Sequence, residues 1–299
     1  MEVELVILIT MIGTFLLVNL LLKLPVSLSM IGGAIAGALV AGEGIPLRHL
    51  FEGSFVYVDT ILTISTAMIF MKVIQESGAL EALTSSIVCR FHKRPEIMLI
   101  LIMLMIMFPG MITGSSTAAV LSAGAIVAPI LLMMGITRAK TAAIIAMGAI
   151  MGMAAPPVNI PAMLIAGGVD MPYIGFEGPL LFLTLPCAMI IVLLLGLNPS
   201  SKFEFDKIKC GLNLDTYKEH GFKLYIPIIV LMVLMVITRV FPTAVPNLGM
   251  PLIFTISSTI GFFTGKRFNI SKTIQDAMKT TIPVLGKLMG VGMFIQIMT

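Results

Sequence analysis

Two short runs of turn-forming residues interrupt sequence that is otherwise apolar enough to cross a membrane. They are Gly114-Ser115-Ser116-Thr117 and Ala155-Pro156-Pro157-Val158-Asn159-Ile160-Pro161. In hydrocarbon every backbone N–H and C=O needs a partner, so irregular backbone persists there only against protein or beside water. Secondary transporters build substrate and ion sites from such broken helices. The two runs therefore predict a membrane carrier.

The first run offers hydrogen-bond donors to an anion. Gly114 allows the backbone to turn where a side chain would clash. Ser115, Ser116 and Thr117 add three hydroxyls at the start of a helix, whose free N–H groups carry partial positive charge. We expect an anionic substrate to bind at this turn.

The second run offers oxygen ligands to a cation. Pro156 and Pro157 supply no N–H, so they break the helix and free carbonyls of the preceding turn. Carbonyl, amide and hydroxyl oxygens suit a hard cation, which predicts sodium near Gly114, Ser115, Ala154 and Asn159. The predicted substrate- and ion-binding residues are Gly114, Ser115, Ser116, Thr117, Met153, Ala154, Pro156, Pro157, Val158 and Asn159.

Composition agrees with a membrane protein that is not an enzyme. The chain is 58% hydrophobic and 11% charged, with mean hydropathy +1.07, which predicts several spans. Its net charge of +4 is spread between apolar segments, and this argues against nucleic acid. The three cysteines form no C-x-x-C, so they imply neither a disulfide framework nor a metal site with cysteine ligands. No H-E-x-x-H, G-x-S-x-G or Walker A sequence is present. Sodium is the only cofactor expected.

The apolar segments predict an all-α polytopic membrane protein. A first repeat, 1–198, is expected to hold helices over 4–22, 24–42 and 56–76, a surface helix over 79–92, a re-entrant hairpin over 96–134, a broken helix over 139–169 and a helix over 178–197. A cytoplasmic linker over 199–222 leads to the start of a second repeat, 223–299, with helices over 223–241 and 248–265, a surface segment over 266–281 and a last apolar run over 282–299.

Basic residues set the expected orientation. With the N-terminus outside and 96–134 entering and leaving on the cytoplasmic side, most of the 19 Lys and Arg residues fall inside. A single crossing by 96–134 would instead place Arg138 and Lys140 outside, against the positive-inside rule. The hairpin is therefore favoured.

The chain also repeats itself. A shift that lays Leu24 on Leu248 lays Gly37 on Gly261 and Phe70 on Phe294, and apolar and amphipathic segments follow in the same order. The two copies start on opposite sides of the membrane, so the repeats are inverted, as in many carriers. The second copy stops early, which predicts roughly another 125 residues in the intact protein by this repeat arithmetic.

Both runs resemble a known family. Gly114-Ser115-Ser116-Thr117-Ala118, with the alanine-rich arm to Ala128-Pro129, looks like the hairpin of the large membrane subunit of TRAP (tripartite ATP-independent periplasmic) transporters. The run 155–161 is similar to the proline-rich break that follows, although Val158-Asn159 stands where that family commonly has a serine. The resemblance covers roughly 95–200. It implies an elevator-type carrier of the ion-transporter superfamily, sodium coupling and organic-acid substrates such as dicarboxylates. It also implies a small membrane subunit and a periplasmic substrate-binding protein, in a bacterial or archaeal cytoplasmic (inner) membrane.

Three functions stay open at this point. The first is the large permease of a TRAP system. The second is a stand-alone sodium- or proton-coupled dicarboxylate or citrate carrier of the same superfamily, which needs no binding protein. The third is an intramembrane enzyme, which is disfavoured because His49, His92 and His220 all fall in predicted loops or surface segments.

Overall fold

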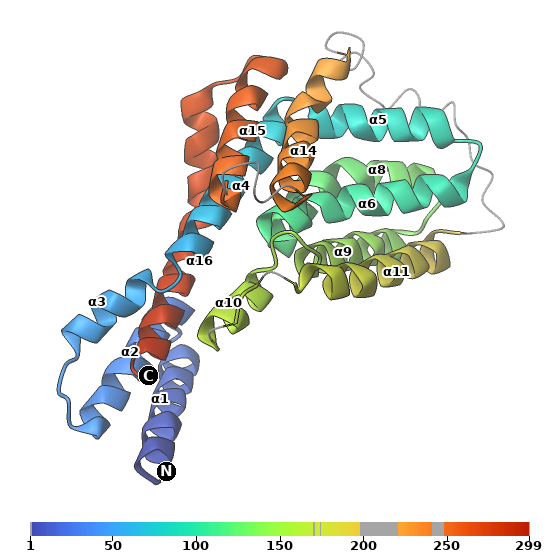
Figure 1. Cartoon of the computed structure of the whole chain (residues 1–299). Coiled ribbons are helices and arrows are strands. Elements are labelled where there is room, and N and C mark those ends of the chain that lie inside the picture. The colour runs from blue at the N-terminus through green and yellow to red at the C-terminus, as the bar shows by residue number, and fades with distance from the viewer. Residues whose placement is uncertain (1, 170, 174, 198–220, 241–247, 299) are drawn as a thin grey trace. The chain divides into compact units, whose positions relative to one another are not determined.

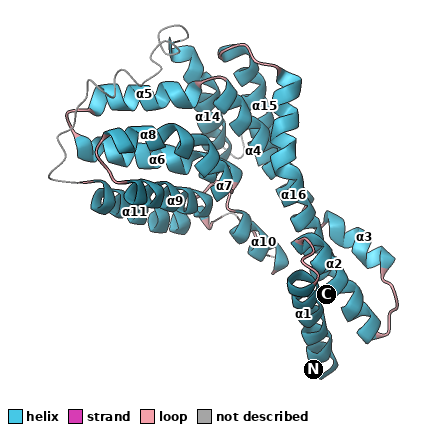
Figure 2. Cartoon of the chain, turned by 180° about the vertical axis from the view of Figure 1, so that it is seen from behind, coloured by secondary structure: helices cyan, strands magenta, loops and turns pink. Residues whose placement is uncertain are grey.

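The computed structural model describes residues 2–169, 171–173, 175–197, 221–240 and 248–298, and every regular element in these ranges is a helix (Figures 1 and 2). The first elements are α1 (Glu2–Leu21), α2 (Val26–Ala41), α3 (Leu47–Phe55), α4 (Val58–Glu76), α5 (Ala79–Phe91) and α6 (Pro95–Thr113). The helical run after α6 comprises α7 (Ser116–Ala119), the π-helix η1 (Val120–Gly124) and α8 (Ala125–Met133). The remaining elements are α9 (Arg138–Ala154), α10 (Ile160–Gly168), α11 (Glu177–Gly196), the 3-10 helix η2 (Gly221–Tyr225), α14 (Ile226–Val240), α15 (Met250–Thr264) and α16 (Ile270–Gln296). Nearly all of the predicted linker 199–222 lies outside the described residues.

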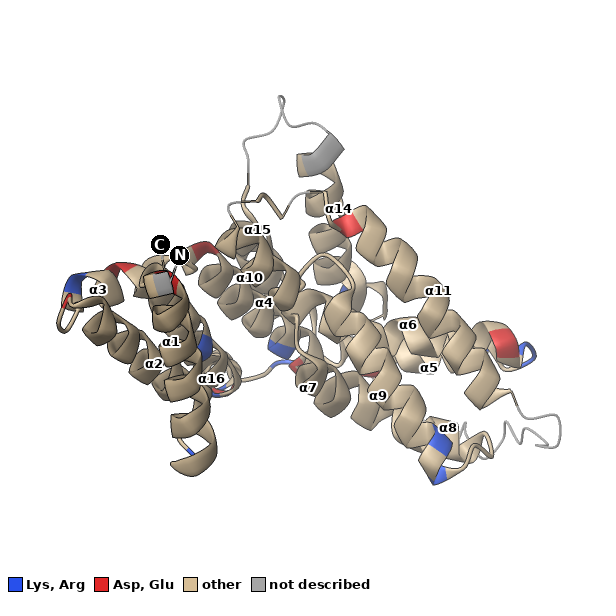
Figure 3. Ribbon diagram, turned by 90° about the horizontal axis from the view of Figure 1, so that it is seen from below, with Lys and Arg blue, Asp and Glu red and all other residues tan. Residues whose placement is uncertain are grey.

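The helices confirm the expected class, an all-α protein with several membrane-grade spans. Among the residues that the structure describes, six stretches are long and apolar enough to cross a membrane: Val3–Leu21, Val58–Glu76, Pro95–Thr113, Ser116–Met133, Glu177–Gly196 and Gly221–Thr238. Figure 3 shows charged residues mostly at helix ends and in connections, with uncharged ribbon between them. This pattern fits a multi-pass membrane protein. The orientation stays a prediction.

Residue contacts divide the chain into two compact units, Met1–Leu62 with Met278–Thr299, and Thr63–Ala277. In the first unit α1 packs along α2, where Gly33 and Gly37 of α2 approach Met11 of α1. Gly53 of α3 meets the backbone of α16 at Gly292 and Met293. These units are not the predicted repeats, and the repeat assignment stays a prediction.

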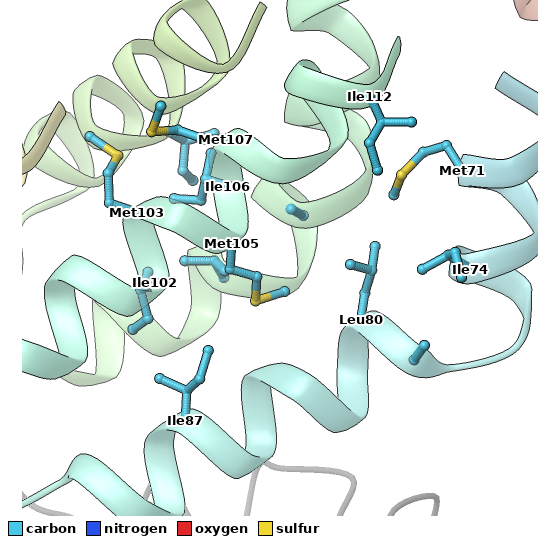
Figure 4. Close-up of a cluster of buried hydrophobic side chains, with 14 of the residues drawn as sticks. Met71, Ile74, Leu80, Ile87, Ile102, Met103, Met105, Ile106, Met107 and Ile112 are labelled. Atoms are coloured by element: carbon cyan, nitrogen blue, oxygen red, sulfur yellow. The ribbon is translucent and has the colours of Figure 1, made fainter. Parts of the chain in front are cut away.

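The second unit is built around α6. Helices α5, α9 and α11 each pack on α6, and α14 packs on α15. Figure 4 shows Leu80 and Ile87 of α5 facing Ile102 and Met105 of α6 within a fully apolar cluster. Unbranched methionine fills irregular gaps between helices. This core fixes the end of α6, at which the predicted hairpin turns.

Two expectations about surface segments are wrong. The helix expected at the surface over 79–92 is α5, and Leu80, Ala82, Ile87 and Val88 on it are buried in the core. Its small Ala, Ser and Thr residues suit close packing between helices. The expected boundary between 281 and 282 is also absent, because α16 runs unbroken through Pro283.

Candidate functional site

The hairpin turns at the predicted glycine. Helix α6 ends at Thr113, and Gly114 adopts the left-handed conformation with φ +61° while its N–H donates to the Gly110 carbonyl at 2.8 Å. A Cβ at Gly114 would lie 2.6 Å from Cγ1 of Ile160 and 3.1 Å from the carbonyl oxygen of Val158. Both the conformation and the space therefore require glycine.

The return helix begins with a hydroxyl cap. Ser115 is extended, and its Oγ accepts from the N–H of Ala118 at 3.3 Å. The Ser115 N–H donates to Oγ1 of Thr113 at 3.3 Å, and that hydroxyl donates to the Pro109 carbonyl at 2.7 Å. The N–H groups of Ser116 and Thr117 occupy the first turn, where no helical carbonyl precedes them. Ser116 is half-buried and Thr117 exposed, so this positive helix end is open to a ligand.

A π-helix follows the tip, and sequence reasoning missed it. It spans Val120–Gly124, and within it Oγ of Ser122 donates to the Ala118 carbonyl at 2.6 Å. π-helical turns are rare and are frequent at functional sites. The only sequence signal is the small-residue run Ser122-Ala123-Gly124, which also suits ordinary helix packing.

The second interruption is a real break between α9 and α10. Helix α9 ends at Ala154, and the Pro156–Pro157 peptide bond is cis. The Ala155 N–H donates to the Met151 carbonyl at 2.9 Å and also to the Gly152 carbonyl at 3.2 Å. Because residue 157 is proline, the Met153 carbonyl has no N–H four residues later to accept from. The predicted free carbonyl is therefore at Met153.

The Asn159 amide spans this break. Its Nδ2 donates to the Ala154 carbonyl at 2.7 Å, and its Oδ1 accepts from the N–H of Ala162 at 3.0 Å, capping α10. Asn159 is only 5% exposed. Two of the predicted sodium ligands, Ala154 and Asn159, are thus hydrogen-bonded to each other. A cation at this place would bind to the remaining lone pair of the Ala154 carbonyl oxygen.

A backbone hydrogen bond joins the hairpin to the break. The Val158 N–H donates to the Met111 carbonyl at 3.0 Å, which the turn at Gly114 leaves without its usual partner, the N–H of Ser115. Figure 2 shows α7 beside α9 at this end of α6, and α7 contacts both helices. The two runs that the sequence singled out are therefore one structural feature.

The helices behind this junction cross through two glycines. A Cβ at Gly110 of α6 would lie 2.9 Å from the Gly152 carbonyl carbon and 2.9 Å from the Met153 nitrogen. A Cβ at Gly152 would lie 2.8 Å from Cα of Met107. The backbones of α6 and α9 thus touch directly, which positions Met153 close to the hairpin.

Of the predicted residues, Gly114 and Val158 come into direct contact, and Met153, Ala154 and Asn159 surround the break behind them. Val158 and Pro156 are buried, whereas Pro157 is half-buried. None of the described hydrogen bonds links the side chains of residues 115–117 to the break. Sequence reasoning also missed Tyr173, which precedes α11 and whose phenol lies next to the Asn159 backbone.

Comparison of the chain with protein-family models and with curated proteins finds no match.

Proposed function

We propose that the chain is a secondary active transporter that imports small organic anions with sodium. The observation that carries this proposal is the Val158-to-Met111 hydrogen bond, because it joins the helix break between α9 and α10 to the turn between two apolar stretches, Pro95–Thr113 and Ser116–Met133, that are long enough to cross a membrane. Irregular backbone in hydrocarbon needs protein or water around it, and carriers use it to bind cargo.

The two sides of the junction suit opposite charges. The N–H groups of Ser116 and Thr117, with the nearby hydroxyls, favour a carboxylate. The Met153 carbonyl, which has no N–H partner at the usual position, favours a hard cation with oxygen preference. None of the ten predicted residues carries a formal charge, so binding both ions together offsets their charges.

Coupling follows if each ion binds best to the same ordered junction. Sodium at the break would hold the hairpin turn in the form that accepts the anion, and the affinity gained is reciprocal. The loaded hairpin and broken helix would then move as an elevator against the other helices, in an inverted-repeat carrier. The resemblance of 95–200 to TRAP permeases supports a small membrane subunit and a binding protein as partners, in a bacterial or archaeal inner membrane. A stand-alone carrier of the same superfamily is the alternative.

Uptake by cells tests the proposal. The intact gene is expressed, with and without its neighbouring genes, in cells that lack dicarboxylate uptake, and labelled succinate and other organic anions are supplied with and without sodium. Sodium-dependent uptake is expected. Dependence on a neighbouring binding protein supports the TRAP form, whereas uptake without it supports the stand-alone form.

Two variants test the site, each with a matched control. Ser116→Leu should abolish uptake, whereas Thr259→Leu, on an exposed face of α15, should not. Asn159→Leu should also abolish uptake. Asn269→Leu removes another helix cap, on the Lys272 N–H at 3.2 Å, and should leave uptake in place. Wild-type uptake in both site variants would refute the assignment.

A further inference from the structure

Tyr173, between α10 and α11, is half-buried and has a buried hydroxyl whose function the fold does not explain. The hydroxyl oxygen of Tyr173 is inaccessible to solvent and makes no hydrogen bond of normal geometry. A buried hydroxyl without a partner loses its hydrogen bonds to water and gains none in return. Such a group in a native fold calls for an explanation, and a missing ligand is one.

The phenol is held next to the break. Its oxygen lies beside the backbone N–H of Asn159, close enough for that N–H to lower the pKa of the phenol. The ring stacks on Phe176, with centroids 6.3 Å apart and planes 3° from parallel. The Phe176 N–H donates to the Tyr173 carbonyl at 3.2 Å, and the Gly175 N–H donates to Oε2 of Glu177 at 3.1 Å. The ring stack and the hydrogen bond from Phe176 therefore hold Tyr173 in position.

The phenol remains a hydrogen-bond donor at physiological pH. Burial, together with the negative charge of Glu177, raises the pKa of Tyr173 to about 12. The phenol therefore keeps its own proton and can donate it to an acceptor.

We propose that Tyr173 is a cargo-binding residue, whose hydroxyl donates a hydrogen bond to a carboxylate oxygen of the organic anion bound at the break. The assignment rests on the proposed carrier function and adds a third element, the connection before α11, to the hairpin and the break. A carboxylate fits better than a cation because the phenol keeps its proton and can donate it, and because the Asn159 N–H lies near its oxygen.

Tyr173→Phe tests this assignment, since it removes the hydroxyl and keeps the ring stack on Phe176. Tyr225→Phe is the matched control, because the Tyr225 hydroxyl bonds to Oγ of Ser86 at 3.1 Å, between η2 and α5. Initial rates of sodium-dependent succinate uptake are measured against succinate and against sodium, and normalised to the amount of each variant in the membrane.

Tyr173→Phe should raise the KM for succinate by about tenfold or more, as loss of a hydrogen bond to a charged group does. Its maximal rate and its sodium dependence should stay near those of wild type. Tyr225→Phe should leave the KM for succinate, the maximal rate and the sodium dependence unchanged. An unchanged KM in Tyr173→Phe overturns the assignment, as does a lower maximal rate at unchanged KM, which indicates a purely structural residue. If wild type takes up no organic anion, the carrier proposal itself fails, which is distinct from a wild-type-like Tyr173→Phe.

Discussion

Replacement of Gly152 by alanine tests the helix crossing that supports the candidate site. The added Cβ would lie 2.8 Å from Cα and 3.0 Å from the carbonyl carbon of Met107. Ordinary van der Waals contacts lie at 3.4–4 Å, and the obstacle is backbone, which cannot rotate away as a side chain can. Helices α6 and α9 must therefore separate, and a gap of about 0.5–1 Å forfeits a quarter to a half of each dispersion contact.

Overpacking of this kind costs about 1–3 kcal/mol. For a chain of this size we expect the unfolding midpoint of Gly152→Ala to fall by about 3–10 °C. Gly110→Ala should behave similarly, because its Cβ meets the same crossing from the other side. The double variant should lose less than the sum of the two, since one separation of the helices relieves both clashes.

The assay is thermal unfolding in detergent, followed with a thiol-reactive dye. The chain has no tryptophan and three cysteines, and Cys89 and Cys187 are half-buried free thiols that unfolding exposes. One heating rate is used throughout, because unfolding of such proteins is commonly irreversible. Gly13→Ala is the control, since a Cβ there meets nothing within 4 Å in the middle of α1, and alanine favours a helix. If Gly152→Ala and Gly13→Ala both have the unfolding midpoint of wild type, α6 and α9 do not cross at these glycines.

Three further predictions concern single side chains. Ser115→Ala should lower the unfolding midpoint, by the few degrees that a lost cap of about 1 kcal/mol implies, and Ser115→Asp should restore it in the same thermal assay; no loss on Ser115→Ala would show that the cap on Ala118 adds nothing. Arg48→Ala should leave the unfolding midpoint unchanged, because ion pairs between solvent-exposed groups such as Arg48 and Glu52 add little stability. This is expected even though Arg48 bonds to Glu52 at 2.9 Å and this hydrogen bond lowers the pKa of the Glu52 carboxyl. A clear drop in the midpoint would contradict this reasoning. Tyr173→Phe should remove from the alkaline ultraviolet titration a phenol that ionises at about pH 12. Because the pKa of Tyr173 in the folded protein lies above the ordinary 10.0, the stability of wild type should fall as the pH rises from 10 toward 12, and that of the variant should lack this part of the fall. A phenol titration with its midpoint near pH 10 would contradict the burial of this hydroxyl.

Much of the helix pattern could be predicted because local chemistry dictates it. Prolines without an N–H and a glycine beside apolar runs located the turn at Gly114 and the break after Ala154, and most span boundaries fell within a few residues of the observed ones. The burial of α5 could not be predicted, since its small residues suit either a surface or a tight helix contact.

At the candidate site, the contacts between separate segments could not be predicted from the local sequence. Asn159 was expected to be a ligand, but which partner its amide chooses depends on geometry across the break, and here both ends of the amide bond to the chain. Tyr173 lies between α10 and α11, and nothing in the local sequence indicates that its side chain comes near the break at Asn159. The hydrogen bond from Val158 to Met111 joins residues distant in sequence, so the sequence located both runs without showing that they meet.

Three of the features that join the hairpin to the break involve main-chain atoms alone, and this bears on which ligands the proposed site could accept. The Val158-to-Met111 bond, the Gly114 turn and the Gly110–Gly152 crossing depend on no functional side chain beyond the hydrogen of glycine. Side chains at 116, 117 and 173 can therefore be exchanged while the frame keeps its shape. If the chain is the carrier we propose, a few substitutions at these positions would change its cargo, and its selectivity could diverge faster than its fold.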